Sequence, residues 1–338
     1  IMLFGTISVD RPLCLAPMED VTDRPFRLLC KAQGADVLYT EFANCEALVR
    51  DVPREMEKLV VTEPEHPIGA QIYGSNEASM ERAAAIAEAH GADFIDVNCG
   101  CWVRKIANRG DGAGLLRDLP RMRAAVAGVQ RGTSLPVTVK TRLGWDADSI
   151  VILDVARMLG DMGVQSLTVH CRTREQGYAG KADWSWLPRI KEVCAIPLIG
   201  NGDIAGPEDV ERCFNLGCDG VMIGRAAIQN PWVFHEMKHF FTTGETAPMP
   251  AMKERFALCI QHLREHAAFR GTPRGVYSFR RYYSSYLKGI SGIAQLRRDL
   301  MRLTEVEAII HRLNRFLETY ESEAAHHADE SKRDMDYA

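Results

Sequence analysis

Two cysteines at the end of a short apolar run are the residues best suited to chemistry in this chain. Residues 94–97 are typical of a buried strand, and Asn98, Cys99, Gly100 and Cys101 follow them. Two thiols one residue apart, without a further Cys or His pair at zinc-ligand spacing, do not predict a structural metal site. A working thiol here would be an acid or a nucleophile. The alternative is that both cysteines are small buried hydrophobic residues, as free cysteines usually are.

The segment after the cysteines is also unusual for a protein core. A basic pair, Arg104 and Lys105, precedes a turn with three closely spaced glycines, Gly110, Gly112 and Gly114. An amide, two thiols and a glycine-rich turn at one strand end predict a functional site. The surrounding elements must then hold these residues in place.

Length and composition are those of an ordinary globular protein. The chain has 338 residues, of which 46% are hydrophobic and 25% charged, with a formal net charge of −4. Ten cysteines without a repeated spacing indicate reduced thiols rather than a disulfide framework. No apolar run is long enough to span a membrane and no signal peptide is recognisable. We therefore expect a cytoplasmic protein with no membrane partner.

Charge is distributed unevenly along the chain. Residues 251–320 contain 13 Lys and Arg against 6 Asp and Glu, whereas residues 321–338 contain 2 against 6. A basic segment is therefore attached to an acidic body. It is either a helical bundle with solvated basic faces or an electrostatic surface for a polyanion.

Short apolar runs alternate with amphipathic segments over the first 240 residues. The runs predict strands at 13–16, 36–39, 68–72, 94–97, 137–141, 166–170, 197–200 and 220–223. The segments between them predict helices at 24–32, 41–50, 77–90, 119–130, 148–162, 184–193, 207–216 and 231–241. Asp23 is the expected N-cap of the first helix, with Pro25 in its first turn.

Eight strand–helix units with short connections predict parallel strands and the size of a (β/α)8 barrel. A doubly wound open sheet is the competing architecture, but it usually has fewer strands, and no GxGxxG follows the first strand. We expect the barrel over 1–245 and a small all-helical domain over 246–320. The last stretch, 321–338, is acidic and lacks apolar periodicity, which predicts a frayed or disordered tail.

Active sites of (β/α)8 barrels lie at the C-terminal ends of the strands. Nearly every predicted strand end carries a polar residue or a glycine. In chain order these are Pro17, Met18 and Glu19, then Gln71, Tyr73 and Gly74, then Asn98 and Cys101, then Lys140 and Arg142, then His170 and Arg172, then Asn201, Gly202 and Asp203, then Gly224 and Arg225.

The loops after the seventh and eighth strands are the most informative. Segments 200–203 and 223–225 are glycine-rich and lie where this barrel usually binds phosphate through backbone N–H groups. Arg225 adds a cation, and Lys140 and His170 point into the mouth from neighbouring strands. A flavin mononucleotide fits this set. The alternatives are an ion pair for Lys140 and a buried, hydrogen-bonded imidazole for His170.

Taken together, the motifs resemble the tRNA dihydrouridine synthases, and the bacterial B type in particular. The resemblance spans residues 3–320, and its motifs are jointly specific. They are Ala16-Pro17-Met18-Glu19-Asp20-Val21-Thr22-Asp23, Asp96-Val97-Asn98 with Cys101, Val139-Lys140-Thr141-Arg142, His170 with Arg172-Thr173, Asn201-Gly202-Asp203 and Gly224-Arg225-Ala226.

The resemblance implies an FMN-dependent barrel followed by a helical tRNA-binding domain. It implies cofactor contacts from Pro17, Met18, Gln71, Lys140, His170, Asn201, Gly202, Asp203, Gly224 and Arg225. It implies that Cys101 is the catalytic cysteine, that Asn98 lies beside the substrate base, and that Arg172 contacts base or phosphate. No metal is implied, and we expect a monomer.

The implied reaction reduces the C5=C6 bond of uridine in tRNA to 5,6-dihydrouridine. Reduced flavin delivers hydride to C6, and NADPH or NADH reduces the flavin again. A thiol with a pKa near 8.5 is protonated at neutral pH, so Cys101 can donate the proton to C5 as a general acid. Lys140 and His170 would stabilise negative charge on the flavin or on the uracil carbonyls.

The tRNA contacts should come from the basic C-terminal segment. Arg280 and Arg281 stand beside Tyr282 and Tyr283, which joins cations to aromatic rings. Such cations would contact phosphates, which gives affinity and salt dependence rather than sequence readout. The alternative is that the aromatic residues are core at helical spacing, an interpretation that suits Tyr286 and Phe279 best.

One residue departs from the family pattern. The family usually has proline after the catalytic cysteine, whereas this chain has Trp102. Proline fixes φ and lacks a donor, and tryptophan does neither. Two alternatives therefore remain: a flavin barrel that reduces a small pyrimidine or another small molecule, and a tRNA-binding relative without activity. Cys99 is interpreted as a packing residue.

Overall fold

The computed structural model describes residues 2–4 and 7–336, with side chains from 7 to 322. It divides into two compact units, one formed by Ile1–Ala227 with Trp232–Thr246 and the other by Ile228–Pro231 with Ala247–Ala338. The first unit carries the strands and the second is helical. We expected the first domain to end at residue 245.

In the described part of the chain, eight parallel strands form the barrel. They are β3 (Leu13–Leu15), β4 (Leu38–Tyr39), β6 (Ile68–Tyr73), β7 (Phe94–Cys99), β8 (Val137–Arg142), β9 (Ser166–His170), β10 (Leu198–Asn201) and β11 (Gly220–Ile223). β3 pairs with β11 on one side, and on the other the Leu15 amide donates to the Val37 carbonyl at 2.9 Å, next to β4. The predicted (β/α)8 barrel is therefore confirmed.

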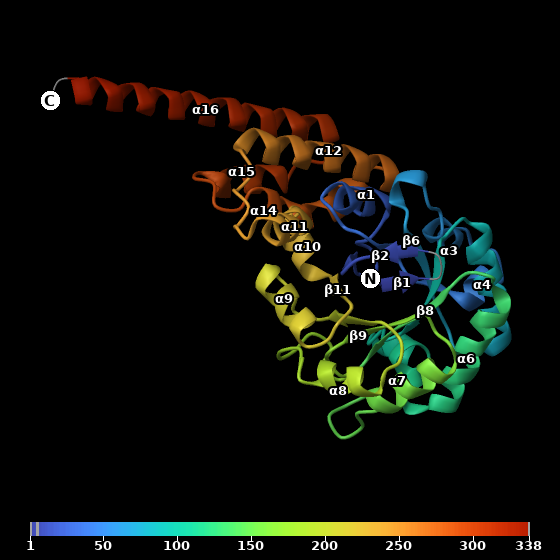
Figure 1. Cartoon of the computed structure of the whole chain (residues 1–338). Helices are drawn as coiled ribbons and strands as arrows, with labels where there is room; N and C mark the ends of the chain where they lie inside the picture. The colour runs from blue at the N-terminus through green and yellow to red at the C-terminus, as the bar shows by residue number, and fades with distance from the viewer. Residues whose placement is uncertain (1, 5–6, 337–338) are drawn as a thin grey trace. The chain divides into compact units, whose positions relative to one another are not determined.

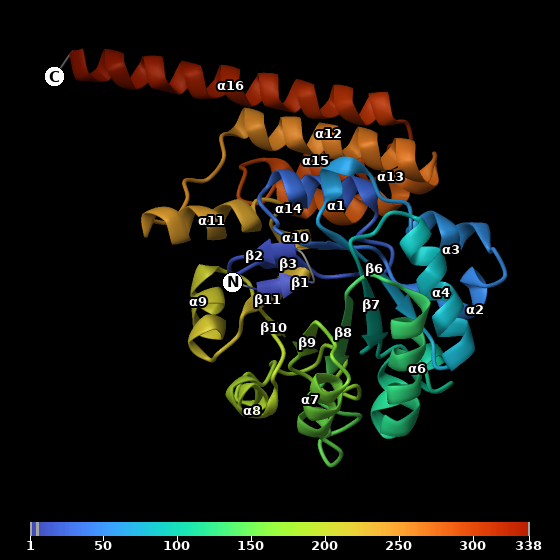
Figure 2. The same cartoon turned by 45° about the vertical axis from the view of Figure 1, so that its right-hand side comes forward.

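Helices cover the outside of the strands (Figures 1 and 2). They are α1 (Arg24–Ala32), α2 (Cys45–Leu48), α3 (Pro53–Lys58), α4 (Glu77–Ala89), α6 (Leu119–Gly132), α7 (Ile152–Asp161), α8 (Trp186–Val193), α9 (Pro207–Asn215) and α11 (Val233–Thr243). Shorter elements in the connections are β5 (Ala43–Asn44), η1 (Glu63–Glu65), α5 (Arg104–Ala107), η2 (Gly112–Arg117) and α10 (Arg225–Gln229). The Asp23 side chain accepts from the Phe26 amide at 3.2 Å, so the predicted N-cap of α1 is confirmed.

The segment 41–50 differs from the single helix predicted for it. Ala43 and Asn44 form β5, which pairs with β6, and only Cys45–Leu48 are helical. The Asn44 side chain accepts from the Ala47 amide at 3.0 Å and so begins the helix later. An asparagine that competes for backbone donors favours a cap over a helix interior.

An antiparallel hairpin, which was not predicted, precedes the barrel. It consists of β1 (Met2–Phe4) and β2 (Ile7–Val9). Ile7 and Val9 pack against the core inside the barrel, which includes Cys14, Tyr39 and Phe94. Because the chain continues from β2 directly to the start of β3, the hairpin covers the amino-terminal end of the barrel (Figure 2).

The second unit is helical throughout its described elements. They are α12 (Met252–Arg270), α13 (Arg274–Phe279), η3 (Arg280–Tyr282), α14 (Tyr283–Tyr286), α15 (Ile293–Leu300) and α16 (Val306–Asp336). α12 and α16 lie side by side, with the Phe256 and Phe316 rings stacked at 6.0 Å between centroids (Figure 1). His262 on α12 packs against the buried rings of Phe279 and Tyr282.

The C-terminal segment differs from the expected disordered tail. Residues 321–336 continue α16, and the last two residues lie outside the described part of the chain. The segment has few apolar residues, and three Ala, three Glu, one Lys and one Arg make up half of residues 321–336. Those residues have high helix propensity, so a helix already begun at Val306 can extend through them.

Candidate functional site

The predicted site residues meet at the C-terminal ends of the barrel strands, which we call the mouth. In the strand register Asn98 lies opposite Lys140, Arg142 opposite His170, and His170 opposite Asn201. Parallel pairing therefore carries the candidate residues of β7, β8, β9 and β10 around one rim, as the barrel prediction requires.

A chain of side-chain hydrogen bonds leads from the barrel interior to the cysteine loop. Gln71 Nε2 donates to Asp96 Oδ2 at 2.6 Å, and Asn98 Nδ2 donates to Gln71 Oε1 at 2.8 Å. Asn98 Oδ1 then accepts from the backbone N–H groups of Gly100 and Cys101 at 3.0 and 2.9 Å. We call this chain the amide relay.

The carboxylate at the inner end fixes the direction of the relay. Asp96 is fully buried and also accepts from Thr138 Oγ1. An ionised carboxylate only accepts, so Gln71 must turn its NH₂ group toward Asp96 and its oxygen toward Asn98. Burial raises the pKa of Asp96 to about 6, which leaves the carboxylate mostly ionised at neutral pH.

The relay gives Gln71 and Asn98 protein partners, and their expected contacts with cofactor and substrate stay predictions. Both side-chain amides are buried and engaged with other protein groups, whereas we predicted a cofactor contact for Gln71 and a substrate contact for Asn98. Their observed effect is to hold the backbone that presents Cys101.

The Cys101 side chain is 9% exposed at the mouth. Burial raises the pKa of its thiol, and the Val103 N–H and the Arg142 charge offset this only in part. The thiol is therefore protonated at neutral pH and able to act as an acid. Cys99, two residues earlier, is fully buried, in agreement with a packing role.

The glycine-rich turn, residues 110–114, packs against the cysteine loop. The Ala113 amide donates to the Cys101 carbonyl at 3.1 Å. Gly112 has φ +55°, and a Cβ there would lie 3.0 Å from Cys101 Cβ and 3.1 Å from its carbonyl oxygen. Only glycine lets this turn approach so closely.

We expect Gly112→Ala to lower the rate of the reaction catalysed at this mouth by about tenfold or more, because the added Cβ requires Cys101 to shift by a few tenths of an ångström. A left-handed alanine also costs about 1–2 kcal/mol of folding stability. Gly163→Ala is the matched control, since Gly163 has φ +73° with nothing within 4 Å. Both variants should lose similar stability in urea unfolding, and only Gly112→Ala should lose turnover. Equal turnover in the two variants would show that Gly112 does not position Cys101.

Arg142 ties the cysteine loop to the loop after β9. Its Nε donates to the Gly100 carbonyl at 3.0 Å, and its Nη1 donates to the carbonyls of Thr173 and Gly177, both at 2.9 Å. The side chain is buried without a described carboxylate bonded to it, and burial lowers its pKa to about 10. This positioning role was not predicted, because only the fold brings the three carbonyls together.

Lys140 stands beside Asn201 in the mouth. Its Nζ donates to Asn201 Oδ1 at 3.2 Å, and Asn201 Nδ2 donates to the Met222 carbonyl at 2.7 Å. Burial and the Arg142 charge lower the pKa of Lys140 to about 8. The ammonium therefore carries most of a charge at neutral pH and can lose it under mildly alkaline conditions.

His170 is held as a neutral imidazole. Arg172 Nη1 lies 3.2 Å from His170 Nε2, and because arginine only donates, that nitrogen must accept and the proton must be on Nδ1. Burial, with the charges of Arg142 and Lys140, lowers the pKa of His170 well below its ordinary value. The ring can therefore offer one N–H donor from Nδ1.

Arg172, for which we predicted a contact with base or phosphate, is buried and bonded to protein groups. It is 1% exposed, and its Nη2 donates to both oxygens of Asp203 at 2.9 and 2.7 Å and to the Gly180 carbonyl at 2.7 Å. All of its donor groups face protein atoms. In the structure it is bonded to His170 and Asp203, and its contact with base or phosphate stays a prediction.

Asp203 joins two cations and a loop. Beside Arg172 it accepts from Arg225 Nη2 and from the Ala182 amide, both at 2.8 Å. Its φ is +58°, in the left-handed region that is uncommon for residues other than glycine. The carboxylate is therefore neutralised by arginines before any ligand arrives.

The glycines after β10 and β11 keep backbone open at the mouth. Gly202 has φ +111°, and a Cβ there would lie 2.8 Å from His170 Cδ2. Gly224 faces Ala16 and Met18, the latter 3.7 Å from where its Cβ would be. Pro17 and Met18 themselves are half-buried at the end of β3. That these residues contact a flavin stays a prediction.

The donor set fits a flavin mononucleotide. A nearly uncharged peptide cradle at Gly202 and Gly224 stands beside the Arg225 cation, which suits a phosphate. The Lys140 ammonium and the His170 Nδ1–H are donors that suit the electron-rich edge of the ring. Of these groups only Arg225 is in a salt bridge, with Asp203.

Trp102 and Tyr178 form an exposed aromatic pair beside Cys101. Their rings meet edge to face at 5.5 Å between centroids, and Trp102 is 37% and Tyr178 50% exposed. The Arg225 guanidinium lies over the Tyr178 ring at 4.7 Å. Tyr178 was not predicted, because an aromatic residue in a long loop carries no periodic signal.

The predicted RNA-contacting arginines lie in the helical unit. Arg281 is exposed, and the Arg280 guanidinium stacks on the Tyr277 ring at 4.7 Å. The neighbouring Tyr282 and Tyr283 are buried, so the aromatic part of this motif is core.

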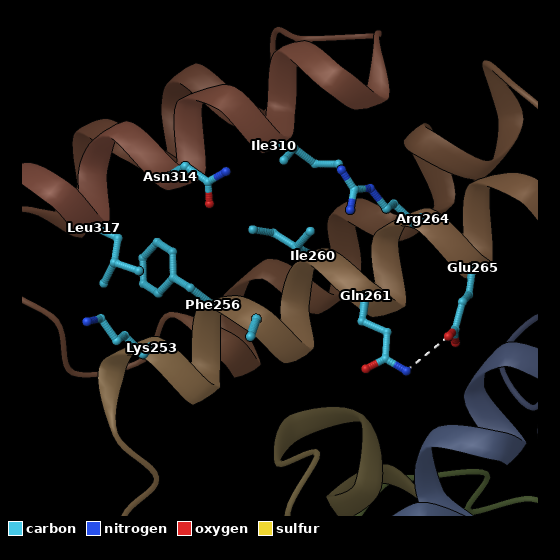
Figure 3. A pocket seen from close by; sticks show the side chains of 10 residues that line it. Lys253, Phe256, Ile260, Gln261, Arg264, Glu265, Ile310, Asn314 and Leu317 are labelled. Carbon is cyan, nitrogen blue, oxygen red and sulfur yellow. Dashed lines mark hydrogen bonds between the residues drawn. The ribbon is translucent and has the colours of Figure 1, made fainter.

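A groove of about 580 Å³ lies between α12 and α16 in this unit (Figure 3). Its lining includes Phe256, Ile260, Ile310 and Leu317, with Lys253 at one end. Among the described residues no cluster of His, Cys, Asp or Glu could hold a metal ion, and none of their helices is both long and apolar enough to cross a membrane.

The fold is similar to barrels of known oxidoreductases. The old yellow enzyme homologue of Zymomonas mobilis matches with a TM-score of 0.51 at 14% identity, covering 75% of this chain and 94% of that one. Histamine dehydrogenase from Rhizobium sp. 4-9 matches with a TM-score of 0.54 at 12% identity, covering 78% of this chain and 51% of that one. At such low identity the likeness extends to the fold alone.

The sequence is more specific than the fold. Residues 14–324 match the dihydrouridine synthase family, and the chain belongs to that family. It is 37% identical to the probable tRNA-dihydrouridine synthase 1 of Synechocystis sp., covering 90% of this chain and 85% of that protein. It is 34% identical to tRNA-dihydrouridine synthase B of Pseudomonas aeruginosa, covering 91% of this chain and 93% of that protein. The expected family is confirmed, and with it the class of flavin-dependent oxidoreductases.

Proposed function

We propose that the protein reduces the C5=C6 bond of uridine in tRNA to 5,6-dihydrouridine, with FMN as cofactor and NADPH as electron donor. The observation that carries the proposal is a protonated thiol, Cys101, fixed at the mouth of a barrel from this family by the amide relay. Tightly positioned acids of this kind are what proton transfer to carbon requires.

When bound, reduced flavin supplies the hydride that adds to C6 of the uracil. Cys101 donates its Sγ proton to C5, and the resulting thiolate is reprotonated from solvent before the next turnover. The Lys140 ammonium and the His170 Nδ1–H stabilise the negative charge that develops around the mouth. The amide relay and Arg142 hold the thiol still while this happens.

We propose that the remaining mouth residues hold the cofactor. Pro17 and Met18 would flank the ring, and the backbone at Gly202 and Gly224 with Arg225 would bind the phosphate. Gln71, Asn201 and Asp203 would act through their neighbours, since their side chains already bond to protein groups. The same argument makes Asn98 and Arg172 positioning residues for Cys101 and His170.

The experiment that tests the reaction uses tRNA purified from cells that lack dihydrouridine. The protein, FMN and NADPH are added, and dihydrouridine is quantified by mass spectrometry. Formation of dihydrouridine only when both FMN and NADPH are present is expected. A yellow protein that oxidises NADPH but leaves all uridines intact would overturn the proposal in favour of a small-molecule reductase.

The proposed reaction should slow as the pH rises through about 8. Lys140 loses its charge there, whereas burial keeps the Cys101 thiol protonated and keeps His170 neutral down to well below pH 6.5. The measurement is a single-turnover pH profile of the flavin-reduced enzyme with saturating tRNA. Lys140→Met should be slow and lack the alkaline decline. A decline that persists unchanged in Lys140→Met would assign it to another group, with Cys101 the first candidate.

We also propose that the helical unit binds the tRNA through arginines, which the basic balance of residues 251–320 supports. Arg281→Ala should weaken tRNA binding and lower the slope of log affinity against log salt concentration by about one. Arg312→Ala is the matched control, because Arg312 is already bonded to Asp299 at 2.9 and 3.0 Å. Filter binding from 50 to 300 mM salt measures both slopes. An unchanged slope for Arg281→Ala would exclude that arginine from the interface.

A cytoplasmic location and a monomeric state complete the proposal. The ten cysteines, all within the described residues, are free and buried, which supports a reducing compartment. The monomeric state stays a prediction and is measured by sedimentation.

A further inference from the structure

The segment that follows Cys101 presents apolar and basic side chains to solvent. Trp102 is followed by Val103, which is 44% exposed, and then by the exposed cations Arg104 and Lys105. Within the described part of the chain, neither cation is bonded to a carboxylate. Covering such a segment with a ligand is favourable, because it removes exposed apolar area from water.

Trp102 is held in a defined place although it is exposed. Its ring packs against Gly177, which has φ +55° and where a Cβ would lie 3.0 Å from Trp102 Cε3. Gly177 is in turn fixed by the hydrogen bond from Arg142 to its carbonyl. The Trp102 ring is therefore packed against Gly177 while remaining 37% exposed, directly after Cys101.

Tyr178 extends the same aromatic surface. It meets Trp102 edge to face, and Arg225 covers part of its ring at 4.7 Å. Exposed rings alternating with cations are the pattern that single-stranded nucleic acid binds, since bases stack on the rings and phosphates contact the cations. A small pyrimidine substrate would leave most of this surface uncovered.

We propose that Trp102, supported by Tyr178, stacks on the nucleobase that flanks the target uridine, while Arg104 and Lys105 contact the adjacent phosphates. The inference rests on the proposed function, because the uridine must leave its stack to bring C5 to Cys101. Its neighbour in the strand then loses a stacking partner, and Trp102 replaces it. Trp102 is thus a substrate-binding residue peculiar to a chain in which proline is absent at this position.

The test compares wild type, Trp102→Ala and Trp102→Phe with a tRNA transcript free of modified nucleotides. Phe241→Ala is the matched control. Phe241 is an exposed aromatic residue whose ring packs on that of Phe214. The Arg11 guanidinium lies over the Phe214 ring, and Arg11 precedes β3, so the pair lies at the amino-terminal end of the barrel. Trp102→Ala should raise the KM for the transcript by about tenfold, and Trp102→Phe should restore most of it. Phe241→Ala should match wild type.

A second measurement identifies the stacked base. Mass spectrometry of the wild-type product gives the modified position, and transcripts are then made with an abasic nucleotide on either side of it. Removing the stacked base should raise the wild-type KM for the transcript about as much as Trp102→Ala does. In the Trp102→Ala variant the same removal should raise the KM almost no further, as a double-mutant cycle requires if the two groups interact. Independent, additive losses would overturn the proposal.

Three further outcomes also decide the matter. If Trp102→Ala changes the KM for NADPH in flavin reduction and leaves the KM for the transcript unaffected, Trp102 serves the nicotinamide and the inference is wrong. If the wild type leaves every uridine intact, the proposed reaction fails and the inference fails with it. If the wild type forms dihydrouridine and Trp102→Ala equals it in every KM, only the inference fails.

Discussion

Cys101→Ala should form dihydrouridine about 10²- to 10⁴-fold more slowly than wild type, the usual contribution of a positioned general acid. Alanine cannot supply the proton at C5, and since Cys101 is only 9% exposed, water should replace its thiol poorly. Cys101→Ser should be slowed too, since a hydroxyl is a far weaker acid. The measurement is the single-turnover rate with reduced enzyme and saturating tRNA.

Cys99→Ala is the matched control for this variant. Cys99 is two residues away and fully buried, so its replacement removes a thiol without touching the mouth. Its rate should lie within about twofold of wild type. If Cys101→Ala keeps more than a tenth of the wild-type rate, or if Cys99→Ala is the slower variant, the acid has been assigned to the wrong residue.

The second large effect is expected from Arg142→Met. Methionine fills similar space but leaves the carbonyls of Gly100, Thr173 and Gly177 without their arginine donor. Buried carbonyls without donors should lower the unfolding free energy by about 2–4 kcal/mol. The cysteine loop and the Tyr178 loop also lose their connection, so the folded, flavin-loaded enzyme should turn over at least tenfold more slowly.

Arg255→Met separates positioning from stability. Arg255 is a buried arginine of the helical unit that donates to backbone carbonyls, one of them Tyr286 at 3.0 Å. Its replacement should cost comparable stability in chemical unfolding. The chemical step is measured at saturating tRNA, under conditions in which both variants are folded. Only Arg142→Met should then show a slower chemical step. Equal slowing would mean that turnover tracks stability and that Arg142 does not position the thiol.

The barrel could be predicted because its information is local and repeated. Each strand is a short apolar run, each helix has its own periodicity, and eight such units leave few topologies. The exceptions are places where a polar side chain alters the local preference, as Asn44 does by capping α2 late. At the C-terminus the absence of apolar periodicity predicted disorder, whereas residues such as Ala and Glu continue the helix.

The site was predicted as a set of positions, and its connections were not. Lys140, His170 and Cys101 could be predicted as site residues because they follow or end predicted strands, and a barrel brings the C-terminal ends of all its strands to one rim. Which side chain faces ligand and which faces protein depends on hydrogen-bond partners far apart in sequence. Gln71 reaches Asp96 across 25 residues, and Arg172 reaches Asp203 across 31.

The hairpin beneath the barrel has a kinetic consequence. Ile7 and Val9 pack against the core at the amino-terminal end, so we expect reactants to approach the thiol from the mouth. For the proposed reaction, the nicotinamide and the RNA must then occupy one entrance alternately. Double-reciprocal plots at several NADPH concentrations would be parallel, and excess of either reactant would inhibit competitively against the other. An enzyme with a single shared entrance needs no allosteric coupling between two binding sites, because each product must leave before the other reactant can enter.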